Sequence, residues 1–122
     1  MHRYESSEDY LETIYMLHLK NQVVRAIDIA NKMNFSKASV SIAMKKLKAR
    51  DLINVSNESG NIELTENGYK IAKDMYDRHN ILSSILMKLG VPEDIARQDA
   101  CKIEHDLSDE SFNAIKNHLS NY

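Results

Sequence analysis

The stretch C-K-I-E-H at residues 101–105 brings a thiol, a carboxylate and an imidazole together near the C-terminal end of the chain. The residue pattern predicts a helix over residues 92–105, and residues three or four apart share one face of a helix. The side chains of Cys101, Glu104 and His105 are therefore expected to converge, and three such donors could hold a metal ion. The alternative is that Cys101 is a small buried apolar residue, the commoner role of a helical cysteine.

Two other segments carry residues of the same kind. Asp9 and Glu12 lie three residues apart on an amphipathic helix that Ser6 or Ser7 is expected to cap, and His79 ends a polar stretch of a long helix. The two acids have a second interpretation, because carboxylates in the first turn offset the positive end of the helix dipole and face solvent. The candidate metal ligands are Asp9, Glu12, His79, Cys101, Glu104 and His105.

Composition limits the class of protein. The 122 residues include three glycines, one proline and one cysteine, so long helices are expected and an intramolecular disulfide is excluded. A structural zinc site that needs two thiolates from one chain is excluded as well. No stretch approaches the roughly 18 apolar residues of a membrane span, and the N-terminus lacks the apolar core of a signal peptide. We expect a cytoplasmic protein with no membrane contact.

The charges are segregated although the net charge is only −2. Residues 36–50 hold five bases and no acid, whereas residues 93–110 hold seven acids and two bases. A basic segment and an acidic segment indicate two separate tasks.

The basic segment has the spacing of a helix-turn-helix. A short helix ending near Met33 is followed by a turn at residues 34–36 and by a helix that Ser36 caps and that runs to about Arg50. On the outward face of this second helix, serines could meet base edges or phosphates, an isoleucine could meet a thymine methyl, and lysines suit phosphates. The alternative is a surface helix with a basic face. The candidate DNA contacts are Ser36, Lys37, Ser39, Ser41, Ile42, Lys45 and Lys46.

A hairpin and three helices complete the expected fold. Residues 52–55 and 62–65 alternate like short strands, which predicts a wing after the recognition helix whose tip could reach the DNA backbone or minor groove. Thr65 is expected to cap the long helix that follows. The predicted fold class is mainly α, with a winged helix-turn-helix domain over residues 1–70 and a helical dimerisation domain over residues 71–122. About 50 residues rarely hold themselves together alone, so a homodimer is expected.

Seven blocks along the chain resemble the metal-dependent repressors related to the diphtheria toxin repressor and the manganese transport regulators. The resemblance implies a homodimer that binds a palindromic DNA operator when divalent iron or manganese is present and represses metal uptake, with the six candidate ligands as its ligand set. The chain stops near the end of the sixth helix, so it resembles the short members that lack an SH3-like domain. The matching blocks are residues 7–15, 27–30, 39–41, 64–68, 78–79, 101–105 and 107–110.

Two departures from the family pattern bear on the metal. Manganese-type members resemble this chain at Asp9 and Glu12 but carry glutamate in place of Cys101, whereas iron-type members have the cysteine but methionine in place of Asp9. A thiolate shifts preference from manganese toward iron, cobalt, nickel or zinc, and it removes a carboxylate that could bridge two ions. The ancillary site of iron-type members looks incomplete, with Ser83 and Arg97 where Glu and His are expected. A divalent transition metal is expected, with Fe²⁺ favoured narrowly over Mn²⁺.

Two other functions fit parts of the sequence. One is a metal-independent winged-helix regulator that responds to an organic ligand, in which Asp9, Glu12 and Cys101 would be replaceable by alanine. The other is an enzyme that pairs Cys101 with His105 or His79 as nucleophile and base. No oxyanion-hole or glycine-rich element accompanies that pair, so no enzymatic activity is expected.

Overall fold

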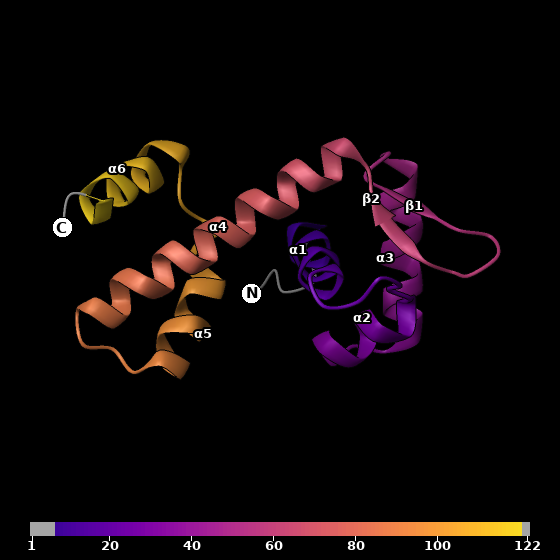
Figure 1. Ribbon diagram of the computed structural model, residues 1–122, viewed down its shortest axis with the longest axis horizontal. Helices are drawn as coiled ribbons and strands as arrows, with labels where there is room; N and C mark the ends of the chain where they lie inside the picture. The colour runs from indigo at the N-terminus through magenta and orange to yellow at the C-terminus, as the bar shows by residue number, and fades with distance from the viewer. Residues whose placement is uncertain (1–6, 121–122) are drawn as a thin grey trace. The chain divides into compact units, whose positions relative to one another are not determined.

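A computed structural model describes residues 7–120, and this part of the chain is mainly helical, as predicted (Figure 1). The contacts divide the chain into two compact units, one ending at Asp74 and one starting at Met75. The expected domain boundary after residue 70 stays a prediction. None of the described helices combines the length and apolar character needed to cross a bilayer. The elements are α1 (Ser7–His18), α2 (Ala26–Met33), α3 (Lys37–Ala49), β1 (Ile53–Val55), β2 (Ile62–Leu64), α4 (Glu66–Lys88), α5 (Glu93–Ile103) and α6 (Asp109–Ser120).

The N-terminal unit is built around one apolar core. Helix α1 packs on α2, α3 and β2, and α2 packs on α3. Leu11 and Ile14 of α1 are completely buried, as are Val24, Ile29 and Val40. Burial of this apolar surface is the main favourable term in folding. Ser7 is the first residue of α1 rather than its cap, and Ser6 lies outside the described residues.

The predicted helix-turn-helix is confirmed. Helix α2 ends at Met33, and its C-cap is Asn34, whose φ of 59° places it in the left-handed region that favours asparagine and glycine. Ser36 is the N-cap of α3, and its Oγ accepts a hydrogen bond of 3.1 Å from the amide of Ser39. The cap and the turn therefore set where the recognition helix starts.

The predicted hairpin is also confirmed, with β1 and β2 antiparallel and Val55 opposite Ile62. The backbone of β2 has a second partner, because the Ile62 amide donates to the Val24 carbonyl at 2.7 Å. Arg25 Nε donates to the Ser59 carbonyl at 2.7 Å. The hairpin is thus fastened to the segment that precedes α2.

Helix α4 starts where the hairpin ends. Thr65 caps it by accepting a bond of 3.1 Å from the Gly68 amide, and the Thr65 hydroxyl donates to the Asp51 carbonyl at 2.8 Å. A Cβ placed on Gly68 would lie 2.0 Å from the Leu52 carbonyl oxygen, so only glycine fits against this backbone. The predicted cap is confirmed, and the glycine explains how closely α4 approaches the end of α3.

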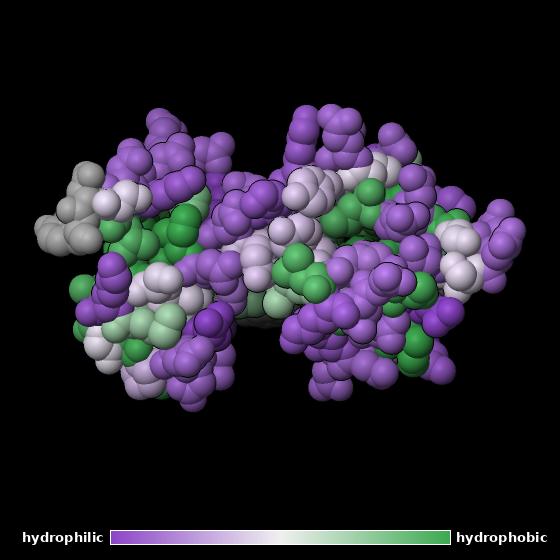
Figure 2. All heavy atoms as spheres, in the orientation of Figure 1, coloured by the Kyte–Doolittle hydropathy of each residue, from purple (hydrophilic) through white to green (hydrophobic). Residues whose placement is uncertain are grey.

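The C-terminal unit consists of the second part of α4 with α5 and α6. Its buried apolar residues include Met75, Leu82 and Phe112. The buried residues of α5 include the small side chains of Ala96 and Ala100, which allow this helix to pack closely within the unit. Apolar atoms also gather at the surface over α6 and the C-terminal part of α4 (Figure 2). The core of this unit is small and lies beside exposed apolar surface. A contact with a second subunit would bury that surface and enlarge the core.

The prediction that α5 continues through His105 is wrong, because α5 ends at Ile103. Glu104 keeps helical φ and ψ and donates its amide to Ala100, but its carbonyl accepts from Arg78 Nη1 at 3.1 Å. A long-range contact thus takes the carbonyl that a further helical turn would have used. His105 therefore lies in the turn that follows α5.

Candidate metal centre and nucleic-acid interface

Glu104 lies between two histidines inside the C-terminal unit. Its Oε2 is 3.7 Å from His79 Nδ1 and its Oε1 is 3.7 Å from His105 Nε2. Bonds from zinc to nitrogen and oxygen donors measure about 2.0–2.2 Å, so two donors of one such ion lie up to about 4.4 Å apart. Each imidazole and the Glu104 carboxylate are therefore close enough to share a divalent ion.

The charge state of His79 suits this task. Burial lowers the pKa of His79 below its ordinary value of 6.5, and the positive charge of Arg97 lowers the pKa further. His79 Nδ1 is buried and makes no hydrogen bond with any described residue. Neutral imidazole is the form that binds metals, and a buried donor or acceptor normally has a partner. The donor set therefore fits a metal ion.

Cys101 differs from these buried groups in its exposure to solvent. Cys101 is exposed and forms no disulfide, whereas Glu104, three residues later, is completely buried. The alternative of a buried apolar cysteine does not hold. Glu104 keeps helical φ and ψ at the C-cap of α5, so it still follows Cys101 by three residues of helical backbone, whereas His105 lies in the turn beyond. Cys101 as a ligand stays a prediction.

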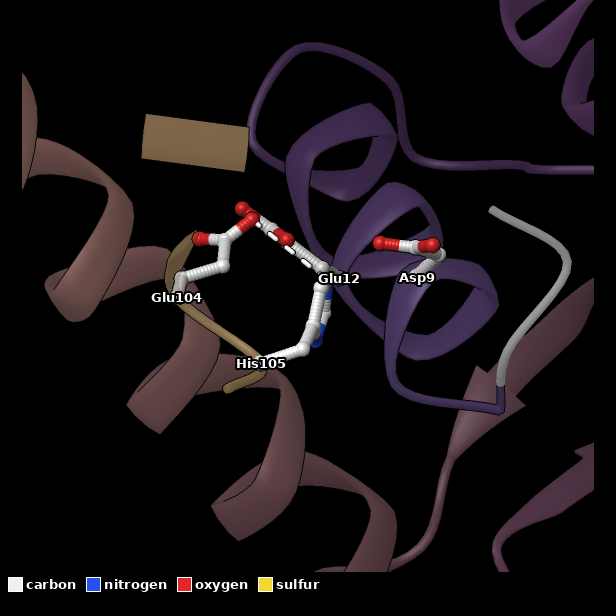
Figure 3. A group of neighbouring side chains, drawn as sticks. All are labelled: Asp9, Glu12, Glu104 and His105. Atoms are coloured by element: carbon white, nitrogen blue, oxygen red, sulfur yellow. Dashed lines mark ion pairs between the residues drawn. The ribbon is translucent and has the colours of Figure 1, made fainter. Parts of the chain in front are cut away.

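The second set of acids belongs to the N-terminal unit. Asp9 and Glu12 leave α1 three residues apart and offer carboxylate oxygens within 4.8 Å of each other (Figure 3). They are only 8% and 6% exposed, so the expected alternative of a solvent-facing acidic surface is wrong. Glu104 and His105 directly follow Ile103, the last residue of α5. Each unit therefore holds metal-type donors of its own.

The outward face of α3 carries the candidate DNA contacts. Ser39 is half-buried and its Oγ accepts a hydrogen bond of 3.1 Å from the Ser36 hydroxyl, so it helps to hold the cap. Ile42 is 56% exposed although it is large and apolar. Packing in the core does not account for an exposed isoleucine among cations, whereas contact with the methyl group of a thymine base would. The other five candidates, Ser36, Lys37, Ser41, Lys45 and Lys46, are exposed.

A groove of about 490 Å³ runs along α3 inside the N-terminal unit. Arg25, Lys45 and Lys48 line it together with Ser41 and apolar side chains. Sequence reasoning missed Arg25 and Lys48 as parts of this surface. Lys48 lies one helical turn beyond the predicted Lys45, whereas Arg25 reaches the groove only because it is fastened to the hairpin.

The tip of the hairpin, residues 56–61, carries one acid, Glu58, and no base. Phosphate contacts in protein–DNA complexes come mainly from cationic side chains and from hydroxyl, amide and backbone donors. The tip offers hydroxyl, amide and backbone donors but no cationic side chain. The nearest cation is Arg25, which bonds the tip through the Ser59 carbonyl. Contact between this wing and DNA stays a prediction.

Two family models match this sequence. Residues 3–61 match the N-terminal DNA-binding domain of the iron-dependent repressors, and residues 65–122 match their metal-binding and dimerisation domain. The chain belongs to the iron-dependent repressor family. It is a metal-dependent, DNA-binding transcriptional repressor, as the resemblance of its sequence blocks implied.

Relatives and a solved structure agree with this family. An HTH-type transcriptional regulator of Methanocaldococcus jannaschii is 36% identical over 114 residues, which cover 92% of this chain and 90% of that protein. The transcriptional regulator MntR of Escherichia coli O6:H1 is 35% identical over 115 residues, covering 94% of this chain and 74% of that protein. The structure of the manganese regulator SloR has 31% identity and a TM-score of 0.83 over 93% of this chain. The chain spans 53% of the length of that solved protein.

Proposed function

We propose that the chain is a homodimeric repressor whose affinity for a palindromic operator rises when a divalent metal is bound jointly by both of its units. The proposed ligands are Asp9 and Glu12 from α1 and His79, Cys101, Glu104 and His105 from the C-terminal unit. The observation that carries the proposal is the existence of two separate sets of low-exposure donors, one in each unit. A divalent cation bound there would supply a positive charge beside the three carboxylates.

The consequence for DNA binding is geometric. Each subunit of a dimer must place its α3 in a half-site, and half-sites lie about 34–36 Å or a multiple apart. In this proposal an ion that is shared by donors from both units fixes the spacing of the two α3 helices without touching DNA. By linkage, DNA then tightens metal binding by the same factor, typically ~1–3 kcal/mol.

The face of α3 reads the operator in this proposal. Lysines at the outward positions neutralise phosphates, while Ser41 and Ile42 meet base edges in the major groove. Arg25 and Lys48 extend the cationic surface beyond the predicted contacts. The chain thus acts by binding, with no catalytic step, on DNA in the cytoplasm.

The metal in this proposal is Fe²⁺, favoured narrowly over Mn²⁺. Iron is supported by Cys101, because thiolate ligands prefer softer ions than manganese. Manganese is supported by the carboxylates Asp9, Glu12 and Glu104 and by the name of the solved neighbour, a manganese regulator. The two ions are separated by the Cys101 substitution described in the Discussion.

The test is operator binding by the full chain with and without metal. An operator is selected from random duplex DNA in the presence of Mn²⁺ or anaerobic Fe²⁺, and its affinity is then measured after chelation. We expect chelation to weaken binding by roughly 5- to 150-fold, the usual range of such coupling. Unchanged affinity would contradict the proposal and favour a metal-independent regulator.

Variants then identify the ligands. Glu12→Gln and Glu104→Gln are expected to abolish the response to metal, one from each unit. Asp94→Asn, which removes an exposed carboxylate in the first turn of α5, is the matched control and should respond like the natural chain. A full metal response in both glutamine variants would remove these carboxylates from the site.

A further inference from the structure

Arg78 precedes His79 in α4 and is the one buried lysine or arginine among the described residues, with 4% exposure. Its Nη1 donates to the Glu104 carbonyl at 3.1 Å and to the Leu107 carbonyl at 2.8 Å. Its Nη2 pairs with the Asp109 carboxylate at the start of α6. One guanidinium therefore holds three points of the segment that connects α5 to α6.

That segment carries two of the proposed ligands and has little regular structure of its own. Glu104 and His105 lie past the end of α5, where the Glu104 amide donates to the Ala100 carbonyl and the Asp106 amide donates to the Ile103 carbonyl. Backbone carbonyls in such a turn need partners, and Arg78 supplies them for Glu104 and Leu107. The planar guanidinium fixes several acceptors at once, which a flexible ammonium does not.

The charge of Arg78 is compatible with a neighbouring metal. A buried cation beside a cation site would repel the ion unless it were paired. Arg78 is paired with Asp109, and its guanidinium lies 4.9 Å from the centre of the Phe112 ring. The positive charge of Arg78 is therefore balanced by contacts with residues of α6.

We infer that Arg78 is a positioning residue for the metal centre. It fixes the Glu104 backbone against α4, so that the Glu104 carboxylate faces His79, the next residue along the same helix. The carboxylate and the imidazole then stand 3.7 Å apart before any ion binds. Nothing in the ligand pattern of the sequence assigns this role. The inference rests on the proposed metal site and adds the residue that shapes it.

The rival explanation is that Arg78 only stabilises the small C-terminal unit. A purely structural residue would change the unfolding temperature but not the ligands around a bound ion. The readout must therefore be spectroscopic. Co²⁺ serves as the probe, because its visible absorption reports the number and type of its ligands in the full-length protein.

Three substitutions make the test. Arg78→Met removes the donors and keeps an apolar stem, Asp109→Asn weakens the ion pair and keeps the two carbonyl bonds, and Lys116→Met removes an exposed cation of α6 as the matched control. We expect Arg78→Met to bind Co²⁺ roughly 10- to 100-fold more weakly, the usual effect of losing an outer partner of a metal ligand. At saturation its absorption spectrum should differ from that of the natural chain. Asp109→Asn should change the Co²⁺ affinity and the absorption spectrum in the same direction but by a smaller amount. Lys116→Met should leave the affinity and the spectrum unchanged.

The outcomes separate this inference from the proposed function. An Arg78→Met variant with natural Co²⁺ affinity and spectrum overturns the positioning role, even if it unfolds at a lower temperature. If circular dichroism shows that Arg78→Met does not fold, Asp109→Asn decides by the same two readouts. Glu104→Gln is the reference, since natural Co²⁺ binding in that variant overturns the proposed site and with it the inference. Weak binding in Glu104→Gln with natural binding in the Arg78 and Asp109 variants leaves the site and removes only the role of Arg78.

Discussion

Ile42 is a single residue whose exposure has a functional explanation. It projects from α3 with 56% of its surface exposed, on a face that otherwise carries hydroxyls and lysines. Leaving such a side chain in water gives no folding stability, but burying it against a thymine methyl would contribute about 0.8 kcal/mol per methylene. The residue is thus better suited to DNA than to the core.

We therefore expect Ile42→Ala to weaken operator binding by about 1–2 kcal/mol, roughly 5- to 30-fold, while leaving stability nearly unchanged. Fluorescence anisotropy with a labelled operator measures the affinity, and urea unfolding measures the stability. Leu19→Ala is the matched control, because Leu19 is 57% exposed in the same unit but lies after α1. Equal effects of the two substitutions on DNA binding would argue against a role for Ile42.

Cys101 decides between the two candidate metals. Anaerobic calorimetry of the metal-free protein with Fe²⁺ and Mn²⁺ is the measurement. If the exposed thiol joins the site, Cys101→Ser should weaken Fe²⁺ binding at least about tenfold and leave Mn²⁺ binding nearly unchanged, because an alcohol is a harder and poorer ligand for iron. If Mn²⁺ binds tightly and equally well to the natural chain and to Cys101→Ser, and Fe²⁺ binds weakly, the ligands are the carboxylates and histidines alone.

At the scale of elements, the start of α4 is the most constrained junction in the N-terminal unit. Thr65 caps the helix and also bonds the Asp51 carbonyl, and Gly68 lies directly on the Leu52 backbone. The helix that leads into the C-terminal unit is therefore held at its first turn by contacts with the end of α3 and the start of β1.

Gly68→Ala is expected to destabilise the protein. Alanine favours a helix over glycine by about 1 kcal/mol, but a Cβ 2.0 Å from a carbonyl oxygen forces the backbone apart, and such overpacking typically costs about 1–3 kcal/mol. Urea unfolding should show a lower midpoint than in the natural chain. Asn67→Ala, at the preceding exposed position of α4, should raise the midpoint slightly. A stabilised Gly68→Ala protein would show that α4 can shift away from Leu52.

At the scale of the whole molecule, the C-terminal unit needs a subunit partner. Its core is small, and two large apolar residues near the α4–α5 connection, Leu89 and Ile95, are 76% and 46% exposed. Residues 65–122 match a dimerisation domain, and burial of this apolar surface in a dimer would supply the stability that so short a unit lacks alone.

We expect the natural chain to sediment as a homodimer at micromolar concentration. Leu89→Asp should raise the dimer dissociation constant at least roughly tenfold, because a charge would have to be buried in the subunit contact. Asn117→Asp, which places the same charge on an exposed position of α6, is the control. A monomeric natural chain would refute the dimer, and a dimer unaffected by Leu89→Asp would move the contact to another surface.

Local signals in the sequence determined most of the fold. Ser36 and Thr65 cap helices through contacts within three residues, and the alternation around residues 57–61 specified the hairpin. These features depend on neighbours along the chain, so spacing and residue type were enough to predict them. The same is true of the family, because its blocks are short stretches in a fixed order.

Tertiary structure decided what depends on partners far along the sequence. Helix α5 ends at Ile103, and Arg78, more than twenty residues earlier, bonds carbonyls of the turn that follows. Cys101 is exposed whereas Glu104, three residues later, is buried, a difference that their spacing does not contain. Arg25 reaches the groove along α3 because the hairpin carbonyl of Ser59 holds it. The sequence alone determined which residues could bind metal or DNA. Only long-range hydrogen bonds and burial determined which of them are brought together, because the spacing of residues along the chain does not contain those contacts.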